Sequence, residues 1–161
     1  MSGTIRVGLG HDTHRLGPGE LLVLGGLAIP HDKAAIGHSD ADVLLHAITD
    51  ALLGAAALGD IGEMFPDTDP ANKGRDSADM LRRAAARVAA AGWRFANLDC
   101  VILAQRPKIL PHRPAMRRRI AEILGVEESA VWLKAKTGES VGPIGEELAI
   151  GAECVALLER A

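Results

Sequence analysis

The alternation of apolar and polar residues predicts that strands open the chain. Residues 5–10 alternate between apolar and polar or small side chains, which is the period-two pattern of a strand. This strand runs into the polar segment His11–His14. Two short apolar runs, residues 21–24 and 27–29, flank a Gly25-Gly26 pair and predict a hairpin.

Helical periodicity follows the hairpin. Ser39-Asp40 can cap a helix that runs to about Leu58. A second helix, rich in Ala and Arg, begins at Asp76 or Ser77 and runs to about Ala91. The apolar stripe of the first helix consists of Leu44, Ile48, Leu52 and Ala55.

Strand and helix patterns continue to alternate in the second half of the chain. We expect a strand over 93–105, a helix over 111–124 that begins near a proline, and strands over 131–136 and 150–158. No repeat or linker divides the chain. The pattern therefore predicts a single domain over residues 1–161 with an α/β or α+β fold, in which helices are layered on one sheet.

Composition narrows the classes of function. Apolar residues make up 48% of the chain, enough to bury a core without a metal or a disulfide. A net charge of −3 and 2% aromatic residues argue against a nucleic-acid partner held by bulk phosphate neutralisation or base stacking. The longest uncharged apolar stretch, Leu21–Pro30, is far shorter than the ~20 residues of a membrane span. Cys100 and Cys154 show no metal-binding spacing and indicate a reducing compartment, so we expect the cytoplasm.

Histidine and aspartate residues form the strongest candidate for chemistry. Asp12 and His14 are two residues apart after the first strand, so they share one face. His46 lies four residues from both Asp42 and Asp50, and Asp50 could orient its imidazole. Asp12, His14 and His46 would give a tetrahedral zinc three ligands and leave one position open, as in catalytic sites. Alternatively, His46 pairs with an aspartate and Asp12 caps a turn. Spacing alone favours this second interpretation, because D-x-H is a common pattern.

Three loops carry further candidate groups. The acidic loop of residues 59–74 is long for a compact domain, and its carboxylates either hold substrate hydroxyls or a metal, or form ordinary turns. Residues 104–110 leave a strand with cations and backbone groups that suit a nucleotide or a solvated connection. Residues 136–139 place a hydroxyl, a glycine and an acid after a strand, where they bind phosphate and a cation or simply turn the chain.

Four segments taken together resemble one family closely. They are GHDTHRLG, HSDADVLLHAITDALLGAAALGDIGEMFPDTDP, AQRPKILPH and KAKTGE, in the order typical of the 2-C-methyl-D-erythritol 2,4-cyclodiphosphate synthases of the non-mevalonate isoprenoid pathway. The resemblance spans essentially the whole chain, and its HSD-to-FPDTDP segment is long and unusual. It therefore favours the functional interpretation of the metal and loop residues.

The resemblance implies a fold, an assembly and a reaction. Each subunit would be a four-stranded sheet with helices on one face and a small hairpin. Three subunits would form a homotrimer with active sites at subunit interfaces. The substrate would be 4-diphosphocytidyl-2-C-methyl-D-erythritol 2-phosphate, whose 2-phosphate attacks the β-phosphorus of its own diphosphate, closes the ring and expels CMP.

The resemblance also assigns roles to residues. Asp12, His14 and His46 would hold Zn²⁺, and Glu139 would hold a second cation, Mg²⁺ or Mn²⁺, between the α- and β-phosphates. Asp60, Gly62 and residues 65–69 would contact the ribose and methylerythritol groups, and residues 104–110 of a neighbouring subunit would form the cytidine pocket. The remaining assignments are His38 and Thr137 as catalytic residues, and Ser39, Asp60, Ile61, Gly62, Phe65, Pro66, Asp67, Thr68, Asp69, Ala104, Gln105, Arg106, Pro107, Lys108, Ile109, Leu110, Lys136 and Gly138 as substrate contacts.

The C-terminal segment departs from the pattern of many members. They carry a Gly-Phe-Thr-Gly-Arg-Gly-Glu-Gly run near the threefold axis, where the arginine meets an isoprenoid diphosphate. In the matching residues 142–149, Pro143 replaces the aromatic residue and Glu146 replaces the arginine. Three copies of Glu146 near the axis would repel an anion, so we expect no isoprenoid diphosphate to bind there. The KTGE segment, in place of the commoner TTTE, retains Thr137 and Glu139.

Two other functions fit many of the same residues. A zinc phosphohydrolase would activate water with the same metals, use His38 as base, and release linear phosphates instead of a cyclic diphosphate. A non-catalytic trimeric module that binds nucleotides would be expected to lose a metal ligand. Asp12, His14, His46 and Glu139 are all present, which favours the synthase.

Overall fold

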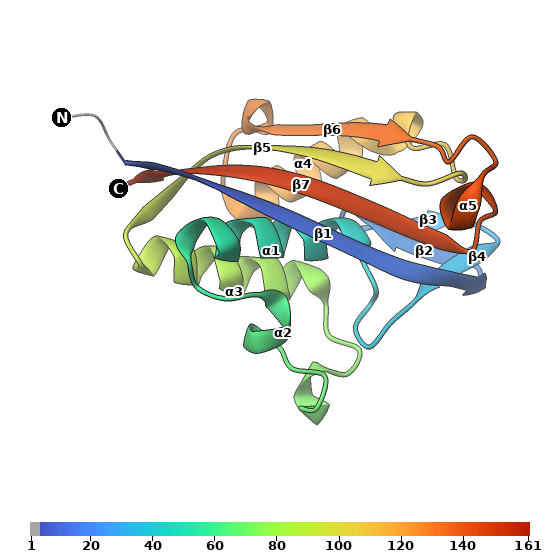
Figure 1. Ribbon diagram of the computed structural model, residues 1–161, viewed down its shortest axis with the longest axis horizontal. Helices are drawn as coiled ribbons and strands as arrows, with labels where there is room; N and C mark the ends of the chain where they lie inside the picture. Colours follow the sequence, from blue (N-terminus) through green and yellow to red (C-terminus); the bar gives the residue numbers. More distant parts are fainter. Residues whose placement is uncertain (1–3) are drawn as a thin grey trace.

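In the computed structural model, which describes residues 4–161, the strands form two sheets (Figure 1). The strands are β1 (Ile5–Pro18), β2 (Leu21–Leu24), β3 (Leu27–Pro30), β4 (Lys33–Ile36), β5 (Trp93–Leu103), β6 (Val131–Lys136) and β7 (Ala149–Arg160). The large sheet has the order β4-β1-β7-β5-β6, and β2 and β3 form the predicted hairpin. All neighbours in the large sheet are antiparallel except β5 and β6, which are parallel.

The three long helices, α1, α3 and α4, cover one face of the large sheet (Figure 1). The helices are α1 (Val43–Ala56), α2 (Ile61–Met64), α3 (Ser77–Ala90), α4 (Arg113–Leu124) and α5 (Gly142–Gly145), with single 3-10 turns η1 (Pro70–Asn72), η2 (Leu110–His112) and η3 (Glu128–Ala130). α1 packs against β1 and β7, α3 packs against α1, and α4 contacts α3 and β6. The predicted mixed fold, with helices layered on one sheet, is confirmed.

The large sheet has five strands and not the expected four. The additional strand is β4, at the edge of the sheet. β4 pairs with residues 15–18 at the far end of β1. This pairing is available because β1 does not end near Leu9. It continues through the polar segment His11–His14 and stays paired with β7 from Ile5 to Arg15.

Two glycines on β1 let α1 lie directly against the strand. A Cβ at Gly8 would stand 1.9 Å from the carbonyl oxygen of Ala51, and one at Gly10 would stand 1.8 Å from that of Ala47. Both obstacles are helix backbone, which cannot move aside cheaply. The strand and the helix therefore approach more closely here than any larger residue would allow.

The opposite face of β1 is apolar, and no helix within residues 4–161 covers it. Ile5, Val7 and Leu9 are 61%, 64% and 69% exposed, and Val155 on the neighbouring β7 is also exposed. The alternation in residues 5–10 thus marks the strand correctly. The helix nevertheless covers the side that carries the glycines.

The N-cap of the first helix lies two residues after Asp40, the second of the two predicted cap residues. Asp42 is the N-cap of α1, and its fully buried carboxylate also accepts hydrogen bonds from the backbone N–H groups of Gly25 (3.0 Å) and Gly26 (2.7 Å). Burial raises the pKa of the Asp42 carboxyl in spite of these bonds. Asp42 thus joins the hairpin turn to the start of α1, and Ser39 and Asp40 make other contacts.

The loop of residues 59–74 contains more structure than its composition predicts. Asp60 caps α2 by accepting from the N–H of Glu63, and Asp69 caps η1 by accepting from the N–H of Ala71. Both aspartates therefore shape the loop that they belong to.

The two cysteines lie in the core, as predicted. Cys100 on β5 and Cys154 on β7 are free and buried, and they stand opposite each other in the strand register. Burial raises the pKa of the Cys100 thiol. Within residues 4–161, no helix has the length and apolar character required to cross a bilayer.

Candidate metal centre

Three side chains from β1 and α1 converge on one point. Asp12 Oδ2 lies 2.9 Å from His14 Nε2 and 3.0 Å from His46 Nδ1, and the two nitrogens are 3.2 Å apart. The ligands of a tetrahedral zinc, each about 2.0–2.1 Å from the ion, stand about 3.3 Å apart, so this triangle has nearly the size that one ion requires. Asp12 and His14 share the helix-covered face of β1, as predicted. The close approach of α1 brings His46 to them.

The outward nitrogen of each imidazole is bound to a protein oxygen. His14 Nδ1 donates to the carbonyl of Ile36 (3.1 Å), and His46 Nε2 lies 2.8 Å from Ser77 Oγ. Such bonds place the ring protons on the outward nitrogens and turn the lone pairs inward. Two imidazole lone pairs and a carboxylate then meet, and a cation relieves their repulsion. The donor set therefore fits a divalent metal ion.

Without a metal, the same carboxylate favours a proton on the neighbouring histidine. The hydrogen bond with Asp12 raises the pKa of His14. Burial acts to raise the pKa of Asp12, but the hydrogen-bond and charge interactions with His14 and His46 together outweigh it and hold this pKa well below its usual range. An ionised carboxylate thus holds positive charge beside it. A metal must displace the histidine proton to bind, so metal affinity falls as the pH becomes acidic.

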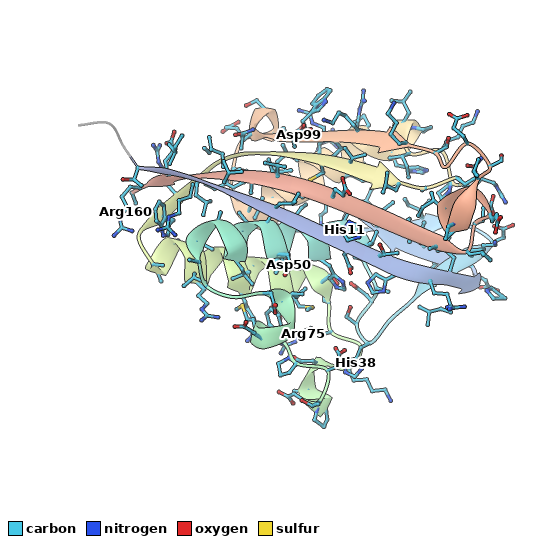
Figure 2. All side chains as sticks on the ribbon, in the orientation of Figure 1. His11, His38, Asp50, Arg75, Asp99 and Arg160 are labelled. Atoms are coloured by element: carbon cyan, nitrogen blue, oxygen red, sulfur yellow. The ribbon has the colours of Figure 1, made fainter. Side chains whose placement is uncertain are left out.

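The triad opens into a pocket of about 230 Å³. Its lining combines apolar and polar side chains. Figure 2 shows His38 in the loop that precedes α1, on the helix side of the sheet. Besides the triad, the lining residues are His38, Ser39, Ile61, Gly62, Phe65, Asp67, Asn72 and Met80.

Four other residues predicted in this region do not line the pocket. Asp60 and Asp69 cap short helices, as described above. The carbonyl of Pro66 accepts a hydrogen bond from the Asn72 side chain (2.9 Å). Thr68 is exposed.

A second pocket, of about 200 Å³, gathers most of the residues assigned to the nucleotide. Arg106 is outside its lining and instead forms ion pairs with Glu147 (3.4 Å) and Asp32 (3.6 Å). The peptide bond between Arg106 and Pro107 is cis. The lining residues are Ala104, Gln105, Pro107, Lys108, Ile109, Leu110, Ala135, Lys136 and Thr137.

Two further predicted residues follow this pocket in a tight turn. Glu139 is exposed, has a φ of 52°, and donates its backbone N–H to Thr137 Oγ1 (3.2 Å). Gly138 has no room for a side chain, because a Cβ would lie 2.3 Å from the backbone nitrogen of Gly145. Thr137 and Glu139 lie outside the lining of the metal pocket, so one chain does not bring all the predicted residues together.

Sequence reasoning missed Ser77 and chose the wrong partner for His46. The carboxylate of Asp50, labelled on α1 in Figure 2, accepts from the backbone N–H of Ile61 (2.8 Å) and so anchors α2. The His46 imidazole instead contacts the hydroxyl of Ser77, the first residue of α3. The sequence indicated only that Ser77 lies at the start of a helix. That position predicts a capping role and says nothing about a histidine. Asn72 and Met80 were also missed.

A three-ligand site of nitrogen and oxygen donors beside an open pocket is the arrangement of a catalytic metal centre, so the fold and the site define a metal-dependent enzyme. A family match covers residues 5–159. The chain belongs to the YgbB family.

Curated relatives cover nearly the whole chain. Proteins from Chromobacterium violaceum (59% identical, 97% of this chain and 99% of the relative) and Gemmatimonas aurantiaca (55%, 98% and 95%) are both named 2-C-methyl-D-erythritol 2,4-cyclodiphosphate synthase.

Solved structures give the same result. A CDP-bound 2C-methyl-D-erythritol-2,4-cyclodiphosphate synthase is 40% identical with a TM-score of 0.88, and the match covers 95% of this chain and 99% of that one. The bifunctional IspDF from Campylobacter jejuni has a TM-score of 0.95 at 38% identity. The match covers 99% of this chain but only 43% of that longer protein.

Proposed function

We propose that this chain converts 4-diphosphocytidyl-2-C-methyl-D-erythritol 2-phosphate to 2-C-methyl-D-erythritol 2,4-cyclodiphosphate and CMP, as one synthase domain over residues 1–161. The observation that carries the proposal is the convergence of Asp12, His14 and His46 on one point beside a pocket. Relatives that are 55% and 59% identical are named for this synthase.

The chemical difficulty of this reaction is charge. The 2-phosphate of the substrate attacks its own β-phosphorus, a new P–O bond forms, and the bond to the α-phosphate oxygen breaks to release CMP. One pair of unit charges 4 Å apart costs about 4 kcal/mol at an effective dielectric constant of 20, and several such pairs meet here. Zn²⁺ held by the triad, and Mg²⁺ or Mn²⁺ held by Glu139, would neutralise this charge and align the attacking and leaving oxygens.

The metal pocket suits the methylerythritol end of the substrate. Phe65, Ile61 and Met80 provide an apolar wall for a methyl group and carbon chain, and Ser39 and Asp67 provide polar groups for hydroxyls. His38 lines the same pocket, where its imidazole can donate to a phosphate oxygen that gains negative charge. No covalent intermediate is required, because the attacking phosphate is already a nucleophile.

The second pocket suits the nucleotide end. Its walls come from the end of β6 and the segment after β5, so backbone groups are available to a cytosine ring. Lys136 and Thr137 lie at its edge and would meet the diphosphate, with Glu139 two residues further along the chain. One substrate must reach both pockets. We therefore place the active site between subunits, where the nucleotide pocket of one chain completes the metal pocket of its neighbour.

A homotrimer would supply this arrangement. The uncovered face of the sheet carries Ile5, Val7, Leu9 and Val155, an apolar patch of the kind that marks contact between proteins. A closed ring of three identical subunits would bury this patch and repeat one composite site three times. The cytoplasm stays the predicted compartment.

Phosphorus NMR of the purified protein with the diphosphocytidyl substrate tests the function. With Zn²⁺ and Mg²⁺ present, we expect CMP and a cyclic diphosphate to appear together and both to be lost on chelation. His46→Ala is the matched negative control. CMP with a linear phosphate would instead identify a hydrolase, and no turnover by the metal-loaded protein would identify a binding module.

A further inference from the structure

We propose that Ser77 and Asp40 are positioning residues for His46, and that they hold its imidazole in the one neutral form whose Nδ1 can bind a metal. The inference rests on the proposed metal site. It concerns a chain of contacts that leads away from that site into the protein, through two residues outside the lining of the pocket.

Ser77 is well placed for this role. It is the first residue of α3, its side chain is fully buried, and its Oγ lies 2.8 Å from His46 Nε2. Asp40, in the loop before α1, binds Ser77 with both carboxylate oxygens. One oxygen accepts the backbone N–H of Ser77 at 3.0 Å, and the other makes a very short contact with the hydroxyl.

The chemistry of these three groups fixes the direction of the hydrogen bonds. An ionised carboxylate can only accept, so the hydroxyl proton of Ser77 points to Asp40. The Ser77 oxygen then offers a lone pair to His46, so Nε2 must carry the ring proton. In neutral imidazole this leaves Nδ1 unprotonated, and Nδ1 is the atom that faces Asp12 at 3.0 Å.

The neighbouring polar groups are poorer candidates. Ser39 Oγ also lies near His46 Nε2, but at the longer distance of 3.1 Å, and it accepts from the N–H of Ala41. The carboxylate of Asp50 is bound to the backbone of Ile61. Ser77 therefore makes the shortest contact to the outward nitrogen, and it alone links that nitrogen to a carboxylate.

Metal affinity in three variants tests the proposal, measured as Zn²⁺ dissociation constants by competition with a chromophoric chelator. Ser77→Ala removes the acceptor, and Asp40→Asn replaces the carboxylate by an amide that attracts the hydroxyl proton less strongly. Each should weaken Zn²⁺ binding about 10- to 100-fold, the usual cost of losing the partner of a metal-bound histidine. Ser77→Thr retains the hydroxyl and should restore most of the affinity.

Asp76→Ala is the matched control. It removes the N-cap of the same helix, because Asp76 accepts from the N–H of Ala78, but it has no contact with His46. We expect its Zn²⁺ affinity to equal that of the wild type. Equal losses in Asp76→Ala and Ser77→Ala would mean that α3 merely needs to be intact, and would overturn the proposal.

A second test determines which ring nitrogen of His46 carries the proton. It uses wild-type protein, so it does not depend on whether the variants fold. In the metal-free wild type at alkaline pH, where no metal dictates the tautomer, long-range ¹H–¹⁵N correlation spectra should show the proton of His46 on Nε2. A proton on Nδ1 would overturn the proposal even if every variant failed to fold. Failure of the metal site itself looks different: wild-type protein would bind Zn²⁺ no more tightly than a variant without the triad.

Discussion

Successive residues of β1 point alternately to a face covered by α1 and to an uncovered face. The two faces differ in the side chains they carry and in what those side chains contact. The covered face has Gly8 and Gly10 under α1 and then the two ligands Asp12 and His14. The uncovered face begins with three exposed apolar residues at positions 5, 7 and 9 and continues with His11, which lies 3.6 Å from Glu153 of β7 (labelled in Figure 2). The covered face carries residues of the candidate metal site, and the uncovered face carries exposed apolar side chains.

This difference shows that a functional requirement can override the usual arrangement of a strand. A strand normally turns its apolar side chains to the helices and its small or polar ones to solvent. Here glycines lie under the helix, because only a close α1 can bring His46 within 3.2 Å of His14. The apolar side chains of residues 5, 7 and 9 are left exposed on the other face.

Gly10→Ala should produce the largest effect, because it separates the helix from the covered face. The new Cβ would lie 1.8 Å from the Ala47 carbonyl, so the helix must shift. We expect the free energy of unfolding to fall by at least about 3 kcal/mol in denaturant titrations. Thr13→Ala, on the uncovered face of the same strand, should change it by no more than about 0.5 kcal/mol. Equal effects would contradict the assignment of the two faces.

His14→Ala should have the next largest effect, and it acts on binding instead of folding. The variant leaves two ligands, so Zn²⁺ affinity should fall about 100-fold or more, and synthase turnover should be lost with it. Isothermal titration with Zn²⁺ measures the affinity. His11→Ala is the matched control on the opposite face of the strand. Similar losses in both variants would show that the metal is bound elsewhere.

Leu9→Glu tests the uncovered face. A buried charge in each copy of an apolar contact is costly, so the trimer should dissociate, while the monomer keeps its fold because Leu9 is exposed. Light scattering coupled to size exclusion should report about 17 kDa for the variant and three times that mass for the wild type. A wild-type mass of one chain would remove the basis for a shared site.

Glu146→Arg should produce the smallest effect, a change in anion binding at the proposed trimer axis. Glu146 is exposed and follows α5. Calorimetry with geranyl diphosphate should detect no saturable binding to the wild type and weak binding to the variant, because the axis then changes from three negative to three positive charges. Tight binding to the wild type would contradict this prediction.

The sequence predicts those parts of the fold and site that depend on short-range pattern. The strand at residues 5–10, the hairpin and the helix starting at Ser77 follow from periodicity and capping. The pairing of Asp12 with His14 follows from their spacing on a strand. The residues also offer His46 as a third ligand, the resemblance to a known family favours this over an ordinary ion pair, and the structure brings all three together.

The remainder depends on contacts between segments far apart in the chain. Edge strand β4 forms because β1 is long enough to offer it a partner, which the polar residues 11–14 conceal. Ser77 meets His46 only through the packing of α3 on α1. The glycines could be recognised as small, but their place under a helix became visible only in three dimensions.

Subunit complementation tests the central claim most directly, namely that the metal triad of one chain works with the nucleotide side of another. His46→Ala and Glu139→Ala, each expected to be inactive alone, are co-expressed with different tags, and trimers that carry both tags are purified. If sites are shared, we predict recovery of up to about a third of the wild-type rate, because one of the three interfaces in each mixed trimer then pairs two intact halves. No recovery in confirmed mixed trimers would contradict the account, since each chain would then have to build its site alone.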